Sequence, residues 1–449
     1  MGKDVRSKTD TVRFFPIFLA ASLSAVIDST QVFIDEAVVG NLFDDVAFGS
    51  INLLEPYLLL ETIFSYLVCV GGPAMIIRAR GANKPEEMRR IFNHCITCDL
   101  IIGLTFFTVL SLFQEPLVRL VAQDSAAYTY ALKLIYWDRY SFLVIALYDF
   151  LFTYSVYLGG ALIGSVSMLT KMGVNTVLSV VLGKSMGIAG VTCATFIANS
   201  MGLIILLAFV IYRHKGIGYR PYLNITYLKT LTLLSLPEAS LFAAVFILES
   251  GANALALRAY SVQGVAVIAI VINLFEFAVY VSEGISEYET AAINQALGEG
   301  NRDKIISSMK TTFRAVFVEG VIFSLLFLFA APLLVDLFDI DDPETVKNAA
   351  SAIRIFAIAP VFLIIIRITA IFNQYTRRIG KAILIWICCV GLLPLVFVFL
   401  LSGISVVAMS IGFVIGPAAA VALLWLIPGR RKAGDVRLKR MTVIFDDEQ

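Results

Sequence analysis

Three glutamates in one apolar segment have the spacing that most clearly suggests chemistry. Glu283 and Glu287 follow Glu276 by 7 and 11 positions, and at about 100° per residue a helix places them within roughly 20° of one line. Asn294 shares that line and Tyr280 lies close to it. Three carboxylates on one line cannot all stay ionised in a low-dielectric environment without cations beside them. This acid stripe (Glu276, Glu283 and Glu287) therefore predicts a site that exchanges protons with another cation.

Two other apolar segments carry acids with helical spacing. Asp28 and Asp35 are seven positions apart with Gln31 between them, and Glu238 and Glu249 are eleven apart. An ionisable side chain at the centre of a membrane-spanning helix costs about 2.5–3.5 kcal/mol on insertion scales, which disfavours an unpaired one facing lipid. We expect these side chains to face a polar interior, with Glu249 opposite the acid stripe.

Some of these polar groups have a structural reading instead. Intramembrane acids also hold helices together through hydrogen bonds. Glu238 follows Pro237 at an expected helix start, where an acid complements the helix dipole. Glu36 and Glu289 lie near expected segment ends, so we expect them at the membrane interface.

Basic residues inside the apolar segments are few, and an Asp138–Arg139 pair is one expected local contact. Even if every one of them pairs with an acid, a surplus of carboxylates remains, and a water-accessible acidic cavity attracts cations. The basic residues within the segments are Lys133, Arg139, Arg354 and Arg367.

The elements that must position these side chains are membrane-spanning helices. Hydrophobic residues make up 59% of the 449 positions, charged residues 15%, and the mean hydropathy is +0.85, which no soluble domain of this size matches. Apolar runs of about 20 residues can span a bilayer. We predict an all-α membrane protein with twelve such segments: 14–40, 52–77, 92–113, 131–157, 160–183, 188–212, 236–257, 264–290, 311–331, 350–373, 381–402 and 404–427.

The chain also repeats itself. The polar loop that starts at Gly81 returns at Gly298, 217 positions later, and two other dipeptides return at an offset of 216: Pro116-Leu117 at 332 and Gly187-Ile188 at 403. Two copies of a six-helix unit are typical of a transporter. We predict two parallel, pseudo-symmetric six-helix bundles around a central cavity, with bundles at 1–212 and 236–449, a cytoplasmic linker at 213–235 and a short basic tail.

Orientation follows from lysine and arginine. On one side the termini and loops carry 27 basic residues, whereas the other side has four, Arg119, Lys184, Arg258 and Lys347. The positive-inside rule then predicts that both termini are cytoplasmic and that the loops near Asp44 and Asp339 are external. The formal net charge of +1 argues against a nucleic-acid partner.

Several motifs resemble the multidrug and toxic compound extrusion (MATE) family over nearly the whole chain. They are, in order, Ile-Asp-Glu-Ala-Val-Val-Gly-Asn at 34–41, Gly-Gly-Pro at 71–73, Arg-Ala-Arg-Gly-Ala at 78–82, Asn175, Gly-Ile-Ala-Gly-Val at 187–191 with Ala194-Thr195, and Leu236-Pro237. The chain departs from the family at Ser179, where prokaryotic members often carry an acid, and in its loops at 81–83 and 298–300.

The resemblance implies export of organic cations against inward H⁺ or Na⁺ across the plasma membrane. It points to Asp35, hydrogen-bonded by Asn175, as a coupling carboxylate, and we add Asn199 to this polar set. We expect no cofactor besides the coupling ion and no metal site, since His94, Cys95 and Cys98 offer too few ligands for zinc. The expected partners are a small organic cation and the bilayer, with the chain acting as a monomer.

Other classes of function fit less well. The sequence has no Gly-x-x-x-x-Gly-Lys-Ser/Thr phosphate loop, so a built-in ATPase is excluded. A lipid-linked saccharide flippase of the same broad superfamily is the alternative, but its polyanionic substrates favour a basic cavity. An intramembrane enzyme could use buried acids as general acids and bases, yet it has no need of a full-length repeat. We therefore expect a transporter and not an enzyme.

Overall fold

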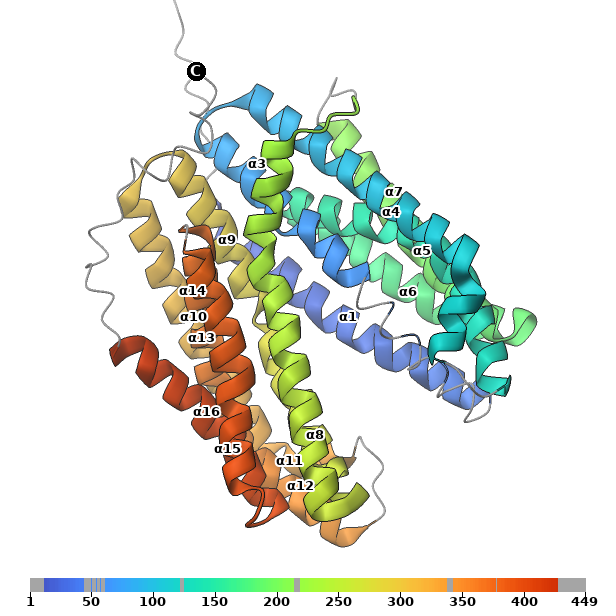
Figure 1. Cartoon of the computed structure of the whole chain (residues 1–449). Helices are drawn as coiled ribbons and strands as arrows, with labels where there is room; N and C mark the ends of the chain where they lie inside the picture. Colours follow the sequence, from blue (N-terminus) through green and yellow to red (C-terminus); the bar gives the residue numbers. More distant parts are fainter. Residues whose placement is uncertain are drawn as a thin grey trace, which may run out of the picture. The chain divides into compact units, whose positions relative to one another are not determined.

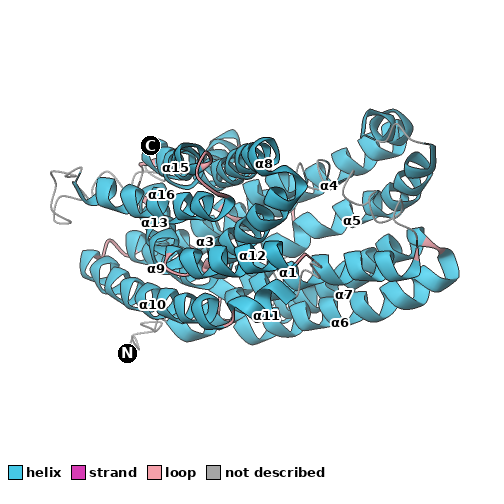
Figure 2. Cartoon of the chain, turned by 90° about the horizontal axis from the view of Figure 1, so that it is seen from below, coloured by secondary structure: helices cyan, strands magenta, loops and turns pink. Residues whose placement is uncertain are grey.

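The computed structural model describes residues 12–43, 50, 54, 57, 61–121, 125–213, 219–336, 342–376 and 378–426. Within these ranges every regular element is helical and none is a strand (Figure 1 and Figure 2). The helices are α1 (Phe14–Leu42), α3 (Gly71–Gly81), α4 (Pro85–Val121), α5 (Ser125–Tyr157), α6 (Ala161–Met186), α7 (Ile188–Arg213), α8 (Ile225–Val281), α9 (Glu283–Gly298), α10 (Arg302–Phe329), α11 (Ala331–Asp336), α12 (Pro343–Phe356), α13 (Ala359–Tyr375), α14 (Ile379–Leu384), the π-helix η1 (Ile385–Leu392), α15 (Leu393–Leu401) and α16 (Val406–Leu426).

The described helices are long and apolar enough to form a multi-pass membrane protein. Ten segments meet that description, and α12 with α13, bent by 49°, supplies an eleventh. Each overlaps one of the expected segments, and α1 occupies the position of the remaining one. The fold class is therefore confirmed. The ten segments are Glu61–Gly81, Pro85–Leu120, Tyr128–Tyr157, Ala161–Met186, Ile188–Arg213, Ile225–Tyr260, Gly264–Gly298, Arg302–Phe329, Ile379–Leu401 and Val406–Leu424.

The chain forms two compact units. Unit 1 comprises residues 1–232 together with 294–301, and unit 2 comprises residues 233–293 together with 302–449. Residues 225–235, expected within the linker, belong to α8 because their apolar side chains extend that span towards its N-terminus. Pro237 therefore lies inside α8 and not at a helix start.

The two loops of the sequence repeat have the same backbone structure. Asn83 and Gly300 both have positive φ, 56° and 65°, a conformation that asparagine and glycine tolerate best. In each loop the next residue donates its N–H to the carbonyl five positions back, at 3.0 and 2.9 Å. The positive-φ residue itself donates to the carbonyl three positions back, at 2.9 and 3.2 Å. Both α3 and α9 thus end in a Schellman motif.

An aromatic cluster forms the core of unit 2 and fixes the helix that carries the acid stripe. Phe275 on α8 packs against Phe356 and Phe413, with ring centroids 6.4 and 6.0 Å apart, and Trp386 is fully buried nearby in the same cluster. Because successive helical residues point about 100° apart, the packing of Phe275 turns its neighbour Glu276 away from this core.

Candidate functional site

The acid stripe lies on a partly open side of unit 2. Glu276, Glu283 and Glu287 are all half-buried. Buried residues such as Ile285 and Ser286 occupy the other side of the same helical turns. The side chain of Tyr280 lies outside the described residues. The helix is interrupted between Val281 and Glu283. Glu276 therefore lies on α8, whereas Glu283 and Glu287 lie on one face of α9, and the expected single line through all three is broken.

Asn294 does not continue the stripe, contrary to expectation. It is fully buried and accepts hydrogen bonds from Nε and Nη2 of Arg78, at 3.1 and 2.5 Å. The guanidinium of Arg78 belongs to the far end of α3, which no helical period within α9 can reveal.

Arg367 of α13 binds at the interruption before Glu283. Its Nε donates to Ser286 Oγ at 2.7 Å, and its Nη1 donates to the Val279 carbonyl at 2.9 Å. Ser282 Oγ donates to that same carbonyl at 2.7 Å. The last carbonyls of a helix lack intrahelical partners, so these two side chains stabilise the end of α8. Arg367 is only 6% exposed.

Two buried glutamates of unit 2 interact with Arg367. Glu238 on α8 and Glu319 on α10 are both buried, and each interacts electrostatically with this guanidinium. One carboxyl oxygen of Glu319 has no hydrogen-bond partner among the described residues. Since α8 begins at Ile225, the expected helix-start role of Glu238 is wrong. Its location beside Arg367 explains its burial instead.

Glu289 is another buried acid of unit 2. It is fully buried, and neither carboxyl oxygen has a hydrogen-bond partner in the described part of the chain. Helix α9 continues to Gly298, so Glu289 lies in the middle of a helix, and its expected place at the membrane interface stays a prediction. A buried carboxyl group without a partner is costly and marks a position where a proton or a cation can bind.

A side chain of α13 binds α8 close to its internal proline. A helix-interior proline removes one backbone donor, and other helices can satisfy the freed groups in a membrane protein. Gln374 Nε2 on α13 donates to the Leu234 carbonyl, in the turn before Pro237, at 2.7 Å. Arg367 and Gln374 of α13 thus donate hydrogen bonds to backbone carbonyls of α8, one at the end of the helix and one near Pro237.

Unit 1 contains buried acids that the sequence reasoning did not select. Glu61 is 6% exposed and Asp99 is 1% exposed. Both oxygens of Asp99 and one of Glu61 lack hydrogen-bond partners among the described residues. Asp149 interacts electrostatically with both acids and accepts a hydrogen bond of 2.7 Å from Ser65 Oγ. Asp99 could have been selected by the argument that selected Glu276, because it is also an acid inside an apolar segment.

Two cations of unit 1 contact aromatic rings within its helices. Lys171 lies inside α6, where it interacts electrostatically with Glu61 and lies 5.0 Å from the ring centroid of Tyr148. The guanidinium of Arg139 lies over the rings of Tyr136 and Tyr140, at 4.3 and 5.0 Å. The expected Asp138–Arg139 pair stays a prediction.

The remaining predicted site residues belong to α1, α6 and α7. Asn175 on α6 is fully buried and Asn199 on α7 is 2% exposed. Helix α1 packs against α6, and its Leu42 lies against Gly183. The side chains predicted on α1, those of Asp28, Gln31 and Asp35, lie outside the described residues. On α8, Glu249 is half-buried.

Acidic groups outnumber basic ones in the buried part of the described chain. Five carboxyl side chains are buried, against two guanidinium groups. The five are Glu61, Asp99, Glu238, Glu289 and Glu319, and the two are Arg78 and Arg367. Among the described residues, no group of three or more histidine, cysteine, aspartate or glutamate side chains is arranged to hold a metal ion. A buried carboxyl group must bind either a proton or another cation.

Comparisons with known proteins show what this chain is similar to. The chain matches the family model MatE over residues 20–183 and 242–400. It is similar to the Multidrug export protein MepA of Staphylococcus haemolyticus (strain JCSC1435), with 19% identity over 348 residues. The matched region covers 76% of this chain and 75% of that protein.

Solved structures share the fold. MATE in complex with MaL6 has a TM-score of 0.85 at 18% identity and covers 95% of this chain and 96% of its own. A MOP superfamily transporter from Pyrococcus furiosus Vc1 (DSM3638), for which reverse polarity of the binding pocket suggests a different function, has a TM-score of 0.80 at 18% identity. That match covers 92% of this chain and 94% of the other.

Proposed function

We propose that this chain, which belongs to the MatE family of membrane transporters, exports organic cations in exchange for inward-moving H⁺ or Na⁺. The relative described as a multidrug export protein supports a drug-like substrate. In this proposal the protein works in the plasma membrane without a cofactor, its only other ligand being the coupling ion.

The excess of buried carboxyl groups over guanidinium groups carries the proposal. An acidic interior attracts cations and repels anions, and buried acids must bind either a proton or another cation. A carboxyl group that can hold either one, but not both, couples the two fluxes. The unpartnered oxygens of Glu289 and Asp99 are the groups of each unit that most require such a ligand.

We assign substrate binding to the acid stripe and coupling in the first half to Asp35. Glu283 begins α9 directly after the interruption at which Arg367 binds. Glu249, also on α8, contributes a further carboxylate. Flat aromatic cations would gain cation–π contacts with aromatic residues beside these acids.

The orientation in this proposal follows the charge asymmetry of the loops, with both termini in the cytoplasm. Substrate then leaves towards the side that carries Asp44 and Asp339. A reporter fused after Gln449 tests this directly, since enzymatic activity confined to the outside of the cell would reverse the orientation and with it the proposed direction of export.

The deciding experiment is ethidium efflux from cells that express the protein, with the proton and sodium gradients collapsed separately. Efflux that stops when one gradient collapses, and not when the other does, identifies the coupling ion. Efflux that survives both would contradict secondary antiport. Cells expressing an exposed-acid variant, Glu344→Gln, serve as the matched control because Glu344 lies at the exposed start of α12.

The flippase alternative makes the opposite prediction about charge. A polyanionic lipid-linked saccharide needs basic partners, so removal of buried acids would leave its transport intact. Loss of transport in variants of the acid stripe, together with competition by organic cations and not by polyanionic saccharides, separates the two functions.

A further inference from the structure

A strap of chain that leads into α8 is fastened to α4 within unit 1. The strap comprises residues 219–224, which have no regular secondary structure. Its backbone N–H groups therefore lack helix or strand partners and need other acceptors. The N–H of Tyr222 donates to Thr97 Oγ1 at 3.1 Å, and the N–H of Asn224 donates to His94 Nδ1 at 3.4 Å. His94 and Thr97 are three positions apart on α4, so they lie on the same face of that helix.

The contact at Thr97 does not depend on pH. A hydroxyl has one donor and two acceptor lone pairs. Thr97 Oγ1 donates to the Asn93 carbonyl at 2.7 Å, so it accepts from both the Tyr222 N–H and the Tyr219 hydroxyl, each at 3.1 Å. Of these groups only the tyrosine hydroxyl titrates, ordinarily at about pH 10, so this part of the attachment is constant near neutral pH.

Asn224 joins the strap to the start of α8. Its Oδ1 accepts from the N–H groups of Thr226 and Tyr227 at 2.8 and 3.1 Å, which is the pattern of a helix N-cap. Its carbonyl accepts from the N–H of Leu228 at 3.0 Å. The backbone N–H that donates to His94 thus belongs to a residue whose two oxygens are bound to α8, so the contact with His94 holds the first turn of α8 as well as the strap.

The contact at His94 requires a neutral imidazole. A neutral ring has one acceptor nitrogen, whereas a protonated ring has two donors and no acceptor. Because Nδ1 accepts from Asn224, the proton of the neutral ring lies on Nε2. Protonation of Nδ1 would place two N–H groups against each other. His94 is also fully buried, where a charge without water or a partner is costly. The closed strap is therefore compatible only with the neutral ring.

The groups that contact His94 do not compensate a positive charge on it. On α4, Cys98 Sγ lies 3.7 Å from Nε2, and a thiol is only a weak partner. On α8, the ring of Tyr227 lies edge-on at 5.7 Å between centroids. The hydroxyl of Tyr227 donates to Glu87 and interacts electrostatically with Arg90. In the part of the chain that the structure describes, no carboxylate accepts a hydrogen bond from His94.

Two other helices pack on α4 in this region, and they include a second source of pH dependence. Helices α3 and α5 place Gly72 and Phe150 against Cys95, the residue after the histidine, and neither side chain titrates. The buried acid Asp99 lies five positions after the histidine, about 140° around α4, and interacts electrostatically with Asp149 of α5. A test of His94 must therefore separate its protonation from that of these two acids.

We propose that His94 is a pH-sensitive latch for the strap. The neutral imidazole holds Asn224 against α4, and protonation releases the strap so that water reaches the ring. The strap is closed above the pH at which the ring takes up a proton, ordinarily about pH 6.5, and opens as the pH falls through that value. It lies between the two stretches that the MatE model matches, 20–183 and 242–400, so the latch makes the connection between them sensitive to pH.

Hydrogen exchange of the full-length chain in detergent, read by mass spectrometry, tests the latch. Protection factors, corrected for intrinsic exchange rates, are compared at about pH 8 and about pH 5, the range in which histidine titrates. Peptides that cover the strap should lose protection about two- to tenfold at the lower pH, the size of one hydrogen bond.

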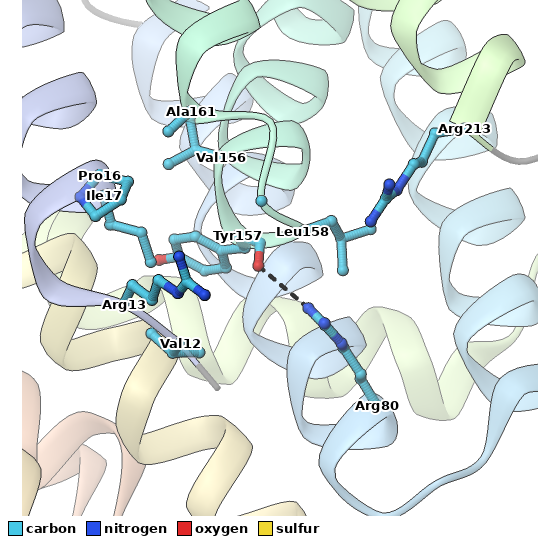
Figure 3. Close-up of a pocket in the computed structure, with 11 residues that line it drawn as sticks. Val12, Arg13, Pro16, Ile17, Arg80, Val156, Tyr157, Leu158, Ala161 and Arg213 are labelled. Carbon is cyan, nitrogen blue, oxygen red and sulfur yellow. Dashed lines mark hydrogen bonds between the residues drawn. The ribbon is translucent and has the colours of Figure 1, made fainter. Parts of the chain in front are cut away.

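The turn between α5 and α6 is the internal reference for this measurement. There the Tyr157 carbonyl accepts from Arg80 Nη1 at 3.4 Å (Figure 3), and the N–H groups of Gly159 and Gly160 donate to the carbonyls of Val156 and Ser155. A guanidinium stays charged throughout this pH range. Protection of this turn should therefore be the same at both pH values.

Substitutions of the two histidines separate the latch from other titrating groups. His94→Gln keeps an acceptor but cannot take up a proton, so the strap should be equally protected at both pH values. His214→Gln is the matched control, because His214 is the other histidine of the sequence, and it should lose protection as the wild type does. That variant also contains a single histidine, whose NMR titration should have the same midpoint as the loss of protection. This second measurement keeps the test valid if His94→Gln does not fold.

Three results are decisive. A loss of strap protection that follows the histidine titration and is absent from folded His94→Gln supports the latch. An equal loss in folded His94→Gln would assign the response to other groups, such as Asp99 and Asp149, and would overturn the role of His94. A strap that stays protected while His94 takes up its proton, or a His94 that takes up no proton in this range, would overturn the latch itself.

Discussion

Arg78 and Asn294 are 216 positions apart and are joined by two hydrogen bonds to the same amide oxygen. They belong to a close crossing of α3 with the end of α9. A Cβ on Gly81 would lie 2.2 Å from the Gln295 carbonyl oxygen, and a Cβ on Gly298 would lie 2.0 Å from that of Arg78. Gly298 lies 217 positions after Gly81, and Gln295 lies 217 positions after Arg78, so exchanging the two copies of the repeat converts one contact into the other. The repeat in the sequence therefore corresponds to a local two-fold relation in space.

Alanine at this crossing should destabilise the protein strongly. In Gly81→Ala and Gly298→Ala the new methyl group meets backbone oxygen, which cannot rotate away, and overpacking of this kind costs about 1–3 kcal/mol or more. Thermal unfolding in detergent should show a lower Tm for both variants. Gly173→Ala is the control, because a Cβ there meets nothing within 4 Å and alanine favours a helix by up to about 1 kcal/mol. Equal Tm values for all three variants would refute the crossing.

Removal of the Arg367 side chain should leave buried acids uncompensated. Arg367 donates hydrogen bonds to Ser286 and to the Val279 carbonyl, and loss of a hydrogen bond to a charged group costs about 1.5–3 kcal/mol, so Arg367→Gln should lower the Tm clearly at neutral pH. The deficit relative to wild type should shrink as the pH falls, because protonation of Glu238 and Glu319 removes their charge. Arg354→Gln, at an exposed position of α12, should behave like wild type. A pH-independent deficit would point to lost packing instead of lost charge.

Neutralisation of Asp35 should abolish uphill export. Asp35→Asn retains the size of the side chain but cannot exchange a proton near neutral pH, and the hydroxyl of Ser179 cannot titrate there either. Protein levels should stay near those of wild type. Resistance to cationic dyes is the measurement, and full resistance in this variant would remove Asp35 from the coupling mechanism.

The acid stripe should discriminate between charged and neutral substrates. Glu283→Gln should weaken binding of a cationic substrate by about tenfold, the size of one charge-assisted contact, and flatten the pH dependence of transport. A neutral compound should be affected much less. Equal losses for both compounds would indicate a folding defect. Unchanged transport in the triple variant, with Glu276, Glu283 and Glu287 all replaced by glutamine, would make the stripe structural.

The start of α12 should show a pH dependence of its own. Asp342 caps this helix by accepting hydrogen bonds from the Thr345 hydroxyl and N–H, and they lower the pKa of its carboxyl group below the usual 3.8. A lowered folded-state pKa stabilises the native state above the unfolded-state pKa, and this stabilisation disappears as pH falls through the folded value. Asp342→Asn should keep the cap but lose that acid-induced drop, as followed by hydrogen exchange at α12.

The sequence by itself determined the spans and the repeat, including the two polar loops that follow α3 and α9. These properties depend on neighbours along the chain: hydropathy over about 20 residues, and the glycine or asparagine that tolerates positive φ at Gly300 and Asn83. The acid stripe could be found from the sequence because its three glutamates have helical spacing within one apolar segment.

Only the tertiary structure decided which acids are buried and which cation each one meets. Glu289 and Asp99 are buried because other helices cover them, and no periodicity within their own segments records that cover. Arg367 lies 81 positions from Ser286, so its binding at the interruption between α8 and α9 exists only once α13 is packed there. Burial and ion pairing in a membrane protein are properties of several helices at once, whereas a sequence pattern describes one helix at a time.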